Sequence, residues 1–249
     1  MKSKFDLAGQ VVTITGAAGD IGRAAALAVA GCGAAVVLGD VDDGRLRETA
    51  ELVVAAGGKA AMMHVDVREP ADAASFAKLA VERFGRLDGA LCVAGVIGRE
   101  TILTSTLENW KAVNDINLTG TFLCVQAAAR EMIACGHGGS IVVYSSGIVQ
   151  HSPPRGVEYS SGKLGMLALM RSSAGELGPH GIRVNAIAPG VIQTQMSRPE
   201  SWPRIAEQAV LKRVGVPDDL TGPACFLLSE DAGYITGLTM YVNGGLFMT

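Results

Sequence analysis

Short apolar runs rich in β-branched residues alternate along the chain with longer segments whose apolar positions recur at helical spacing. The short runs are almost continuously apolar, as expected for strands that are covered on both faces. They predict strands at residues 11–15, 34–38, 60–65, 89–93, 140–144, 183–187 and 239–242. The longer segments predict helices at residues 21–31, 43–56, 72–84, 106–134, 157–177, 199–210 and 218–228.

This alternation of strands and helices is typical of an α/β protein in which a parallel sheet carries helices on both faces, a doubly wound fold. No linker rich in Ser, Gly and Pro divides the sequence, so we expect residues 1–249 to form a single domain. Ligands of doubly wound folds bind beyond the carboxyl ends of the strands. Functional residues are therefore expected directly after strands.

A glycine-rich stretch, TGAAGDIG at residues 15–22, joins the first strand to the first helix. Gly16 permits a tight turn, Gly19 lets a pyrophosphate approach the backbone, and Gly22 lets the helix pack closely on the sheet. The phosphate charge would meet the free N–H groups where the helix begins, at Asp20 and Ile21. An ordinary strand-to-helix turn is the alternative, but the position after the first strand favours dinucleotide binding.

An acidic residue, Asp40, ends the second strand. Its carboxylate can accept hydrogen bonds from both ribose hydroxyls of NAD and repels the 2′-phosphate of NADP. No Arg or Lys precedes Gly19 in the glycine loop or follows at residues 41–42, and the nearest cation, Arg45, lies in the next helix. We therefore expect NAD as the cofactor, while a role for Asp40 as the start of a loop is the alternative.

Two further residues, Asp66 and Val67, follow the third strand. Asp66 could bond the amino group of an adenine, with Val67 beside the ring. A role for Asp66 in starting the next helix is equally compatible with the local sequence.

Tyr159 and Lys163 lie one helical turn apart in the helix predicted at residues 157–177. An ammonium group at this spacing can stabilise a phenolate and lower the pKa of the tyrosine. The spacing alone is a weak signal, but Ser146 follows the preceding strand closely. Asn117 interrupts an apolar helix, where it either makes a structural hydrogen bond or holds a water molecule.

Together these segments resemble the short-chain dehydrogenase/reductase family over essentially the whole chain. The matching pieces are TGAAGDIG at 15–22, Asp40, Asp66-Val67, Asn117, Ser146, YSSGK at 159–163 and PGVIQT at 189–194. Each piece is weak alone, whereas their order and spacing are specific. The resemblance implies a Rossmann-type sheet of seven parallel strands and a hydride transfer that needs no metal.

The resemblance also implies a role for each residue of the site. Tyr159 would be the general acid/base, Lys163 would lower its pKa and bind the nicotinamide ribose, and Ser146 would polarise the substrate oxygen. Asn117 would hold a water that links Lys163 to solvent. The cofactor-binding residues that it implies are Gly16, Gly19, Asp20, Ile21, Gly22, Asp40, Asp66, Val67, Ala94, Gly95, Tyr159, Lys163, Pro189, Gly190, Ile192 and Thr194.

Two positions depart from the family pattern. Cys92 and Val93 stand where the family usually has two asparagines, which we interpret as a change in the support of the sheet. Asn243 stands where many members have Asp, and we interpret it as a structural substitution.

Composition and charge exclude several classes of protein. The net charge is −3 and no stripe of Lys or Arg occurs, so a nucleic-acid partner has no electrostatic footprint. The five cysteines form no CxxC pair, which favours a reducing cytoplasm and excludes a zinc motif. The first residues, MKSKFDLAGQ, contain no apolar stretch of a signal peptide, and no run is long enough to span a membrane. We expect a cytoplasmic protein.

Three segments flank the expected site, at residues 96–99, 147–158 and in a substrate loop of roughly 195–210. Their mixed composition predicts a partly apolar pocket for a secondary or cyclic alcohol or its ketone. The alternatives are an NADPH-dependent 3-oxoacyl-carrier-protein reductase and a non-catalytic nucleotide-binding regulator. Excess apolar residues on the helices at 106–134 and 157–177 predict a homotetramer, as in the family.

Overall fold

In the computed structural model of the protein, which describes residues 5–248, the seven predicted strands form one parallel sheet. The strands are β1 (Val11–Thr15), β2 (Ala35–Asp40), β3 (Lys59–His64), β4 (Gly89–Cys92), β5 (Gly139–Tyr144), β6 (Ile182–Pro189) and β7 (Thr239–Val242). Their spatial order is β3-β2-β1-β4-β5-β6-β7, and every neighbouring pair is parallel. The predicted Rossmann-type sheet is confirmed.

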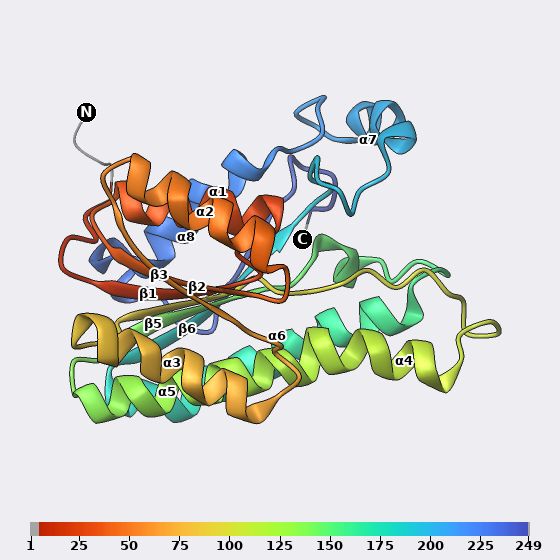
Figure 1. The fold of residues 1–249 in the computed structure, drawn as a ribbon. Coiled ribbons are helices and arrows are strands. Elements are labelled where there is room, and N and C mark those ends of the chain that lie inside the picture. Colours follow the sequence, from red (N-terminus) through yellow and green to blue (C-terminus); the bar gives the residue numbers. More distant parts are fainter. Residues whose placement is uncertain (1–4, 249) are drawn as a thin grey trace.

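Helices cover both faces of this sheet. They are α1 (Asp20–Gly31), α2 (Asp43–Ala55), α3 (Pro70–Phe84), α4 (Leu107–Asn114), α5 (Thr121–Cys135), α6 (Val157–Leu177), α7 (Trp202–Gln208) and α8 (Thr221–Leu228). In Figure 1, α1, α2 and α8 lie on one face, and α3, α5 and α6 lie on the other. Each layer buries its own apolar cluster against the sheet, so the central strands are covered on both sides.

The order of the strands reverses between β1 and β4, because the chain moves outward to β2 and β3 before it returns to β4. Thr15, the last residue of β1, is in register with Gly39 of β2 on one side and with Cys92 of β4 on the other. The carboxyl ends of these strands therefore meet at one edge of the sheet. A reversal of this kind is where doubly wound folds bind their ligands.

The helix predicted at residues 106–134 is interrupted. The chain forms α4, then a π-helix over Asp115–Gly120, and then α5. Single π-turns inside helices commonly occur at functional sites. Apolar spacing predicts a helix but does not distinguish i→i+4 from i→i+5 hydrogen bonding. The π-helix therefore could not be predicted from the spacing of apolar residues.

Two other predicted helices are shorter in the structure. The segment predicted at 199–210 contains a 3₁₀ turn, Pro199–Ser201, followed by α7. The segment predicted at 218–228 begins with a 3₁₀ turn, Pro217–Leu220, before α8. Each of these 3₁₀ turns begins with a proline, Pro199 or Pro217. A proline fits the first turn of a helix, because the N–H that it lacks would be unpaired there.

Residues 1–4 and 249 lie outside the described residues, and with them the beginning of the segment in which no signal peptide is expected. Over the described part of the chain, no helix has both the length and the apolar character to cross a membrane.

Candidate active site

The glycine loop is held against the end of β4. Gly16 has a φ of +70°, and a Cβ atom there would lie 2.7 Å from the backbone nitrogen of Ala94. A Cβ atom on Gly22 would lie 2.1 Å from the carbonyl oxygen of Gly16. Gly19 has an ordinary φ of −74°, and a Cβ atom there would lie 3.3 Å from its nearest neighbour, the carbonyl oxygen of Gly16. Packing therefore requires Gly16 and Gly22, while the role predicted for Gly19 toward a pyrophosphate stays a prediction.

The carboxylate of Asp40 faces the glycine loop. One oxygen accepts the backbone N–H of Ala18 at 2.9 Å. The other accepts the N–H groups of Val41 at 2.7 Å and Asp42 at 3.1 Å. These three bonds fix the carboxylate between the end of β2 and the start of α1. The oxygen that accepts from Val41 and Asp42 has both lone pairs engaged, whereas the oxygen that accepts from Ala18 can accept one further hydrogen bond, as from a ribose hydroxyl.

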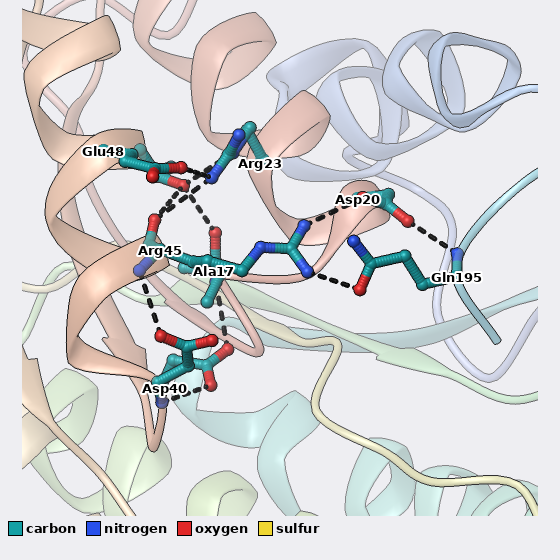
Figure 2. A network of polar contacts seen from close by, with 10 residues as sticks. Ala17, Asp20, Arg23, Asp40, Arg45, Glu48 and Gln195 are labelled. Carbon is teal, nitrogen blue, oxygen red and sulfur yellow. Dashed lines mark hydrogen bonds and ion pairs between the residues drawn. The ribbon is translucent and has the colours of Figure 1, made fainter.

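The arginines around the glycine loop are each paired with a carboxylate, as Figure 2 shows. Arg23 donates to Glu48 at 2.9 Å and also bonds the hydroxyl of Thr49. Arg45 donates to Asp20 at 3.0 Å. Each of these two positive charges is therefore paired with a carboxylate of the protein.

Asp66 is engaged with Arg68. The guanidinium donates to Oδ1 of Asp66 at 2.9 Å and to Oδ2 at 2.5 Å, and this hydrogen bonding lowers the pKa of Asp66. The Asp66 carboxylate therefore already has a strong partner in Arg68. The predicted hydrogen bond from adenine would have to form beside this ion pair. Val67 is buried, and a Cβ atom on Gly120 would lie 2.6 Å from its methyl group.

Ser146, Tyr159 and Lys163 lie together beside the carboxyl end of β5. Tyr159 and Lys163 extend from the first turns of α6, and the Lys163 Nζ lies 5.8 Å from the centre of the Tyr159 ring. Ser146 follows β5, its Oγ accepts the N–H of Ile148 at 3.3 Å, and its hydroxyl is near enough to Tyr159 to lower the pKa of the phenol. Three residues that are separate in the sequence thus form one polar group.

Burial sets the proton affinities of this group. It raises the pKa of Tyr159, and the nearby Ser146 hydroxyl offsets part of that rise. The direction is opposite to the lowering predicted from Lys163, because burial of the phenol outweighs its polar contacts. Burial also lowers the pKa of Lys163 to about 8, and its ammonium donates to the carbonyl oxygen of Tyr144 at 2.7 Å.

Asn117 lies in the π-helix and is fully buried. Its Oδ1 accepts the N–H of Val96 at 2.9 Å, and its Nδ2 donates to the Val96 carbonyl at 2.8 Å. The structural hydrogen bond, one of the two roles considered for Asn117, is therefore present. A Cβ atom on Gly95 would lie 2.8 Å from Asn117 Oδ1 and 3.2 Å from Lys163 Nζ, so only glycine fits between these two side chains.

The segment after β6 closes the other side of the site. Pro189 ends that strand, and a Cβ atom on Gly190 would lie 2.9 Å from the Cα atom of Asn243. Ile192 pairs with Gly215 in a short parallel bridge. Thr194 follows, and its backbone N–H donates to Ser197 at 3.2 Å. The segment that follows β6 is therefore tightly packed where it begins, directly after Pro189, and it contains Gly190, Ile192 and Thr194.

The structure shows what surrounds Cys92 and Asn243, two residues that depart from the family pattern. Cys92 is buried in an apolar cluster that includes Cys124, and this burial raises the pKa of its thiol. It contributes to packing beneath the site. Asn243 donates to the carbonyl of Phe247 at 2.7 Å and accepts the N–H of Gly245 at 3.0 Å, as expected for a structural residue.

Sequence reasoning missed several residues that build the site. The carbonyl of Tyr144 holds Lys163, and the backbone of Val96 holds Asn117. Glu158 is almost fully buried and accepts the N–H of Glu100 at 3.2 Å, which ties the loop after β4 to the start of α6. The sequence offers a signal only for Glu158, which directly precedes Tyr159, because backbone partners leave no trace in residue type.

The residues present fit a dinucleotide. The glycine loop leads into the N-terminus of α1, Asp40 is fixed at the end of β2, and the Nζ of Lys163 lies beside Gly95. Within residues 5–248, no group of His, Cys, Asp and Glu side chains is arranged to hold a metal ion.

Comparisons with known proteins agree with this geometry. A family model described as enoyl-(acyl carrier protein) reductase matches residues 16–247. An L-rhamnose 1-dehydrogenase (NAD(P)(+)) from Sphingomonas sp. (strain SKA58) is 36% identical over 248 residues, covering 97% of this chain and 98% of that protein. A short-chain type dehydrogenase/reductase from Mycobacterium marinum superimposes with a TM-score of 0.94 and 34% identity, covering 98% of each chain.

A carveol dehydrogenase from Mycobacterium avium, solved in complex with NAD, superimposes with a TM-score of 0.92 and 31% identity, covering 98% of this chain and 99% of the other. The matches extend over nearly the full length of both partners in each pair. The chain therefore belongs to the short-chain dehydrogenase/reductase family and is an NAD(P)-dependent oxidoreductase that interconverts alcohols and ketones.

Proposed function

We propose that the protein oxidises a secondary alcohol with NAD, or reduces the corresponding ketone with NADH, with Tyr159 as the general acid/base. The observation that carries this proposal is the group formed by Ser146, Tyr159 and Lys163 beside the glycine loop. When bound, NAD supplies the acceptor for a hydride from the alcohol carbon. The protein's own task is to exchange a proton at the Tyr159 oxygen: the phenolate takes it from the alcohol in oxidation, and the phenol gives it to the ketone oxygen in reduction.

The neighbours of Tyr159 divide the remaining tasks. The Ser146 hydroxyl, which lies near Tyr159, orients the substrate oxygen and stabilises charge that develops on it. Lys163 keeps a positive charge near the phenol below a pH of about 8, where its amine is protonated. Asn117 holds Val96 and thereby the loop beside Gly95, and a water relay from Lys163 would begin next to its amide.

The surroundings of Asp40 support NAD in preference to NADP. A 2′-phosphate would approach the carboxylate that already accepts three backbone N–H groups. The two nearby arginines, Arg23 and Arg45, are engaged with Glu48 and Asp20, so neither offers an unpaired positive charge to a phosphate.

An apolar ring supports a partly apolar or cyclic substrate. The Phe247 ring packs edge-on against His151 at 4.5 Å, and it would lie 3.1 Å from a Cβ atom on Gly147, the residue after Ser146. The description of the matching family model favours acyl-carrier chemistry as a second candidate, a 3-oxoacyl-carrier-protein reductase that uses NADPH. A non-catalytic nucleotide-binding regulator is a third.

The experiment is NADH formation from secondary, cyclic and vicinal-diol alcohols, with NAD⁺ and NADP⁺ compared directly. We expect turnover with NAD⁺ and a loss of turnover of about 10³-fold in Tyr159→Phe, which removes the proton-transfer group. NADH binding should remain within about threefold, since the phenol oxygen is not the main support of the dinucleotide. Turnover with NADP⁺ alone would favour the carrier-linked reductase, and an equal loss of binding and turnover would contradict the role of Tyr159.

We also propose that residues 1–249 act as one catalytic domain, that the protein is a cytoplasmic homotetramer, and that residues 195–210 are its substrate segment. Exposed apolar side chains on α4, α5 and α6 support the tetramer. The described cysteines are all thiols, and thiols persist in a reducing compartment.

A further inference from the structure

Three side chains form a closed set of contacts above the glycine loop, which we call the Asp20–Arg45–Gln195 bridge. Arg45 donates to Asp20 Oδ1 at 3.0 Å and to Gln195 Oε1 at 2.7 Å. The backbone N–H of Gln195 donates to the second oxygen of Asp20 at 2.9 Å. In Figure 2, the Arg45 side chain extends from α2 and meets Asp20 and Gln195 at its tip.

The bridge follows the course of the proposed cofactor. Asp20 begins α1, at the helix N-terminus where the pyrophosphate is expected. Arg45 lies in the first turn of the helix that follows Asp40, the predicted ribose ligand, and Gln195 directly follows Thr194, the predicted carboxamide ligand. The bridge thus connects the segment after Asp40, the predicted ribose ligand, with the segment after Thr194, the predicted carboxamide ligand. Asp20, at the expected pyrophosphate position, lies between them.

The charges of Asp20 and Arg45 compensate each other close to the position expected for the pyrophosphate. A lone carboxylate at the N-terminus of α1 would repel a bound phosphate, and the guanidinium of Arg45 neutralises it. Both side chains are 29% exposed. A pair exposed to this extent contributes little to global stability, so it can open and close while the fold stays intact.

The start of the substrate segment has few other anchors. Beyond Gln195, Arg99 donates to the carbonyl of Met196 at 3.1 Å, and Trp202 bonds Ser197 within the segment itself. The next buried apolar side chain is Ile205 in α7. The contacts of Gln195 with Asp20 and Arg45 are therefore the principal tie between this segment and the glycine loop.

We propose that Asp20 and Arg45 are positioning residues that hold the substrate segment closed over the bound cofactor. The proposal rests on the proposed function, because it takes the crevice between Asp40 and Thr194 as the NAD site. Breaking the bridge would leave Ser146, Tyr159 and Lys163 in place but would let the segment open more often. Cofactor release would become faster, and the substrate would lose one wall of its pocket.

The test measures NADH release by stopped-flow fluorescence in the full-length protein and in Arg45→Met and Asp20→Asn. We expect release about tenfold faster in both variants, with association changed by less than about threefold. Trypsin cleavage after Arg204, in the presence of NADH, should accelerate in parallel. Once an alcohol substrate is known, its KM should rise more than kcat falls.

Glu48→Gln is the matched control, because Glu48 forms a similar ion pair between α1 and α2 but does not contact the substrate segment. Its release and cleavage rates should stay within about twofold of the unmodified protein. Gln195→Ala removes only the Arg45 contact and should give an intermediate release rate even if Arg45→Met folds poorly.

The outcomes separate the two proposals. If the unmodified protein does not bind NADH, the proposed function is wrong and the bridge proposal falls with it. If it binds NADH but Asp20→Asn, Arg45→Met and Gln195→Ala all release it at the unmodified rate, or no faster than Glu48→Gln, only the bridge proposal is overturned.

Discussion

At the scale of single residues, burial decides the chemistry of the site. Lys163 is 4% exposed, and its pKa falls to about 8 because the ammonium is removed from water. A buried cation destabilises the fold at neutral pH even with a carbonyl partner, since water solvates it better than one oxygen does. The site therefore keeps Lys163 at a cost in stability, which a pH titration can measure.

The first prediction concerns Lys163→Met, which removes the buried charge and keeps most of the volume. The folded-state pKa of about 8 lies below the unfolded value near 10.5, so between these pH values the unfolded chain binds the extra proton. The wild type should therefore gain about 2 kcal/mol of unfolding free energy relative to the Met variant between pH 7 and pH 10. Urea denaturation of both proteins at both pH values, under reducing conditions, measures this difference.

The packing that the substitution changes does not depend on pH and cancels in that comparison. A stability difference that is the same at pH 7 and at pH 10 would show that the pKa of Lys163 is not lowered.

At the scale of elements, the π-helix between α4 and α5 ties the helical layer to the loop after β4. Asn117 presents its amide to both backbone groups of Val96, an arrangement that resembles one step of a sheet ladder. The strand and helix pattern predicted most elements to within a few residues. It could not reveal this tie, because the partner is backbone that is remote in sequence and carries no residue code.

The second prediction concerns Asn117→Ala, which removes both hydrogen bonds and leaves the N–H and carbonyl of Val96 without this partner. Each bond contributes about 1 kcal/mol, so we expect a loss of about 2 kcal/mol in unfolding free energy, measured by urea denaturation. Asn109→Ala, an exposed position on α4, is the control and should cost less than about 0.5 kcal/mol. Equal losses in the two variants would contradict the role of the Asn117 amide.

At the scale of the whole molecule, the helical layer of α4, α5 and α6 has an apolar outer face. Among the apolar residues of α6, Leu167 and Met170 are core residues, while Leu164 is 49% exposed. Other large exposed side chains in this layer are Leu107, Trp110, Phe122 and Ile133. A face of this kind is typical of an interface between subunits.

The third prediction concerns assembly. The unmodified protein should have a mass in solution of roughly four times 25.7 kDa, as measured by light scattering after size exclusion. Leu164→Glu should shift the mass to dimer or monomer, because it places a charge in an apolar interface. Val54→Glu, on the exposed face of α2, should leave the mass unchanged. A monomeric wild type, or a Leu164→Glu variant of full mass, would contradict the tetramer.

The sequence by itself determined the parallel sheet and its crevice, because apolar period and strand–helix alternation leave few other ways to bury these residues. It also determined that Asp40 ends a strand, and it indicated the residues that we propose carry the chemistry, Ser146, Tyr159 and Lys163. Only the tertiary structure decided their partners, such as Tyr144 for Lys163, Val96 for Asn117 and Gln195 for Asp20. Periodicity is a local property of the chain, whereas these contacts join segments that meet only once the sheet has formed.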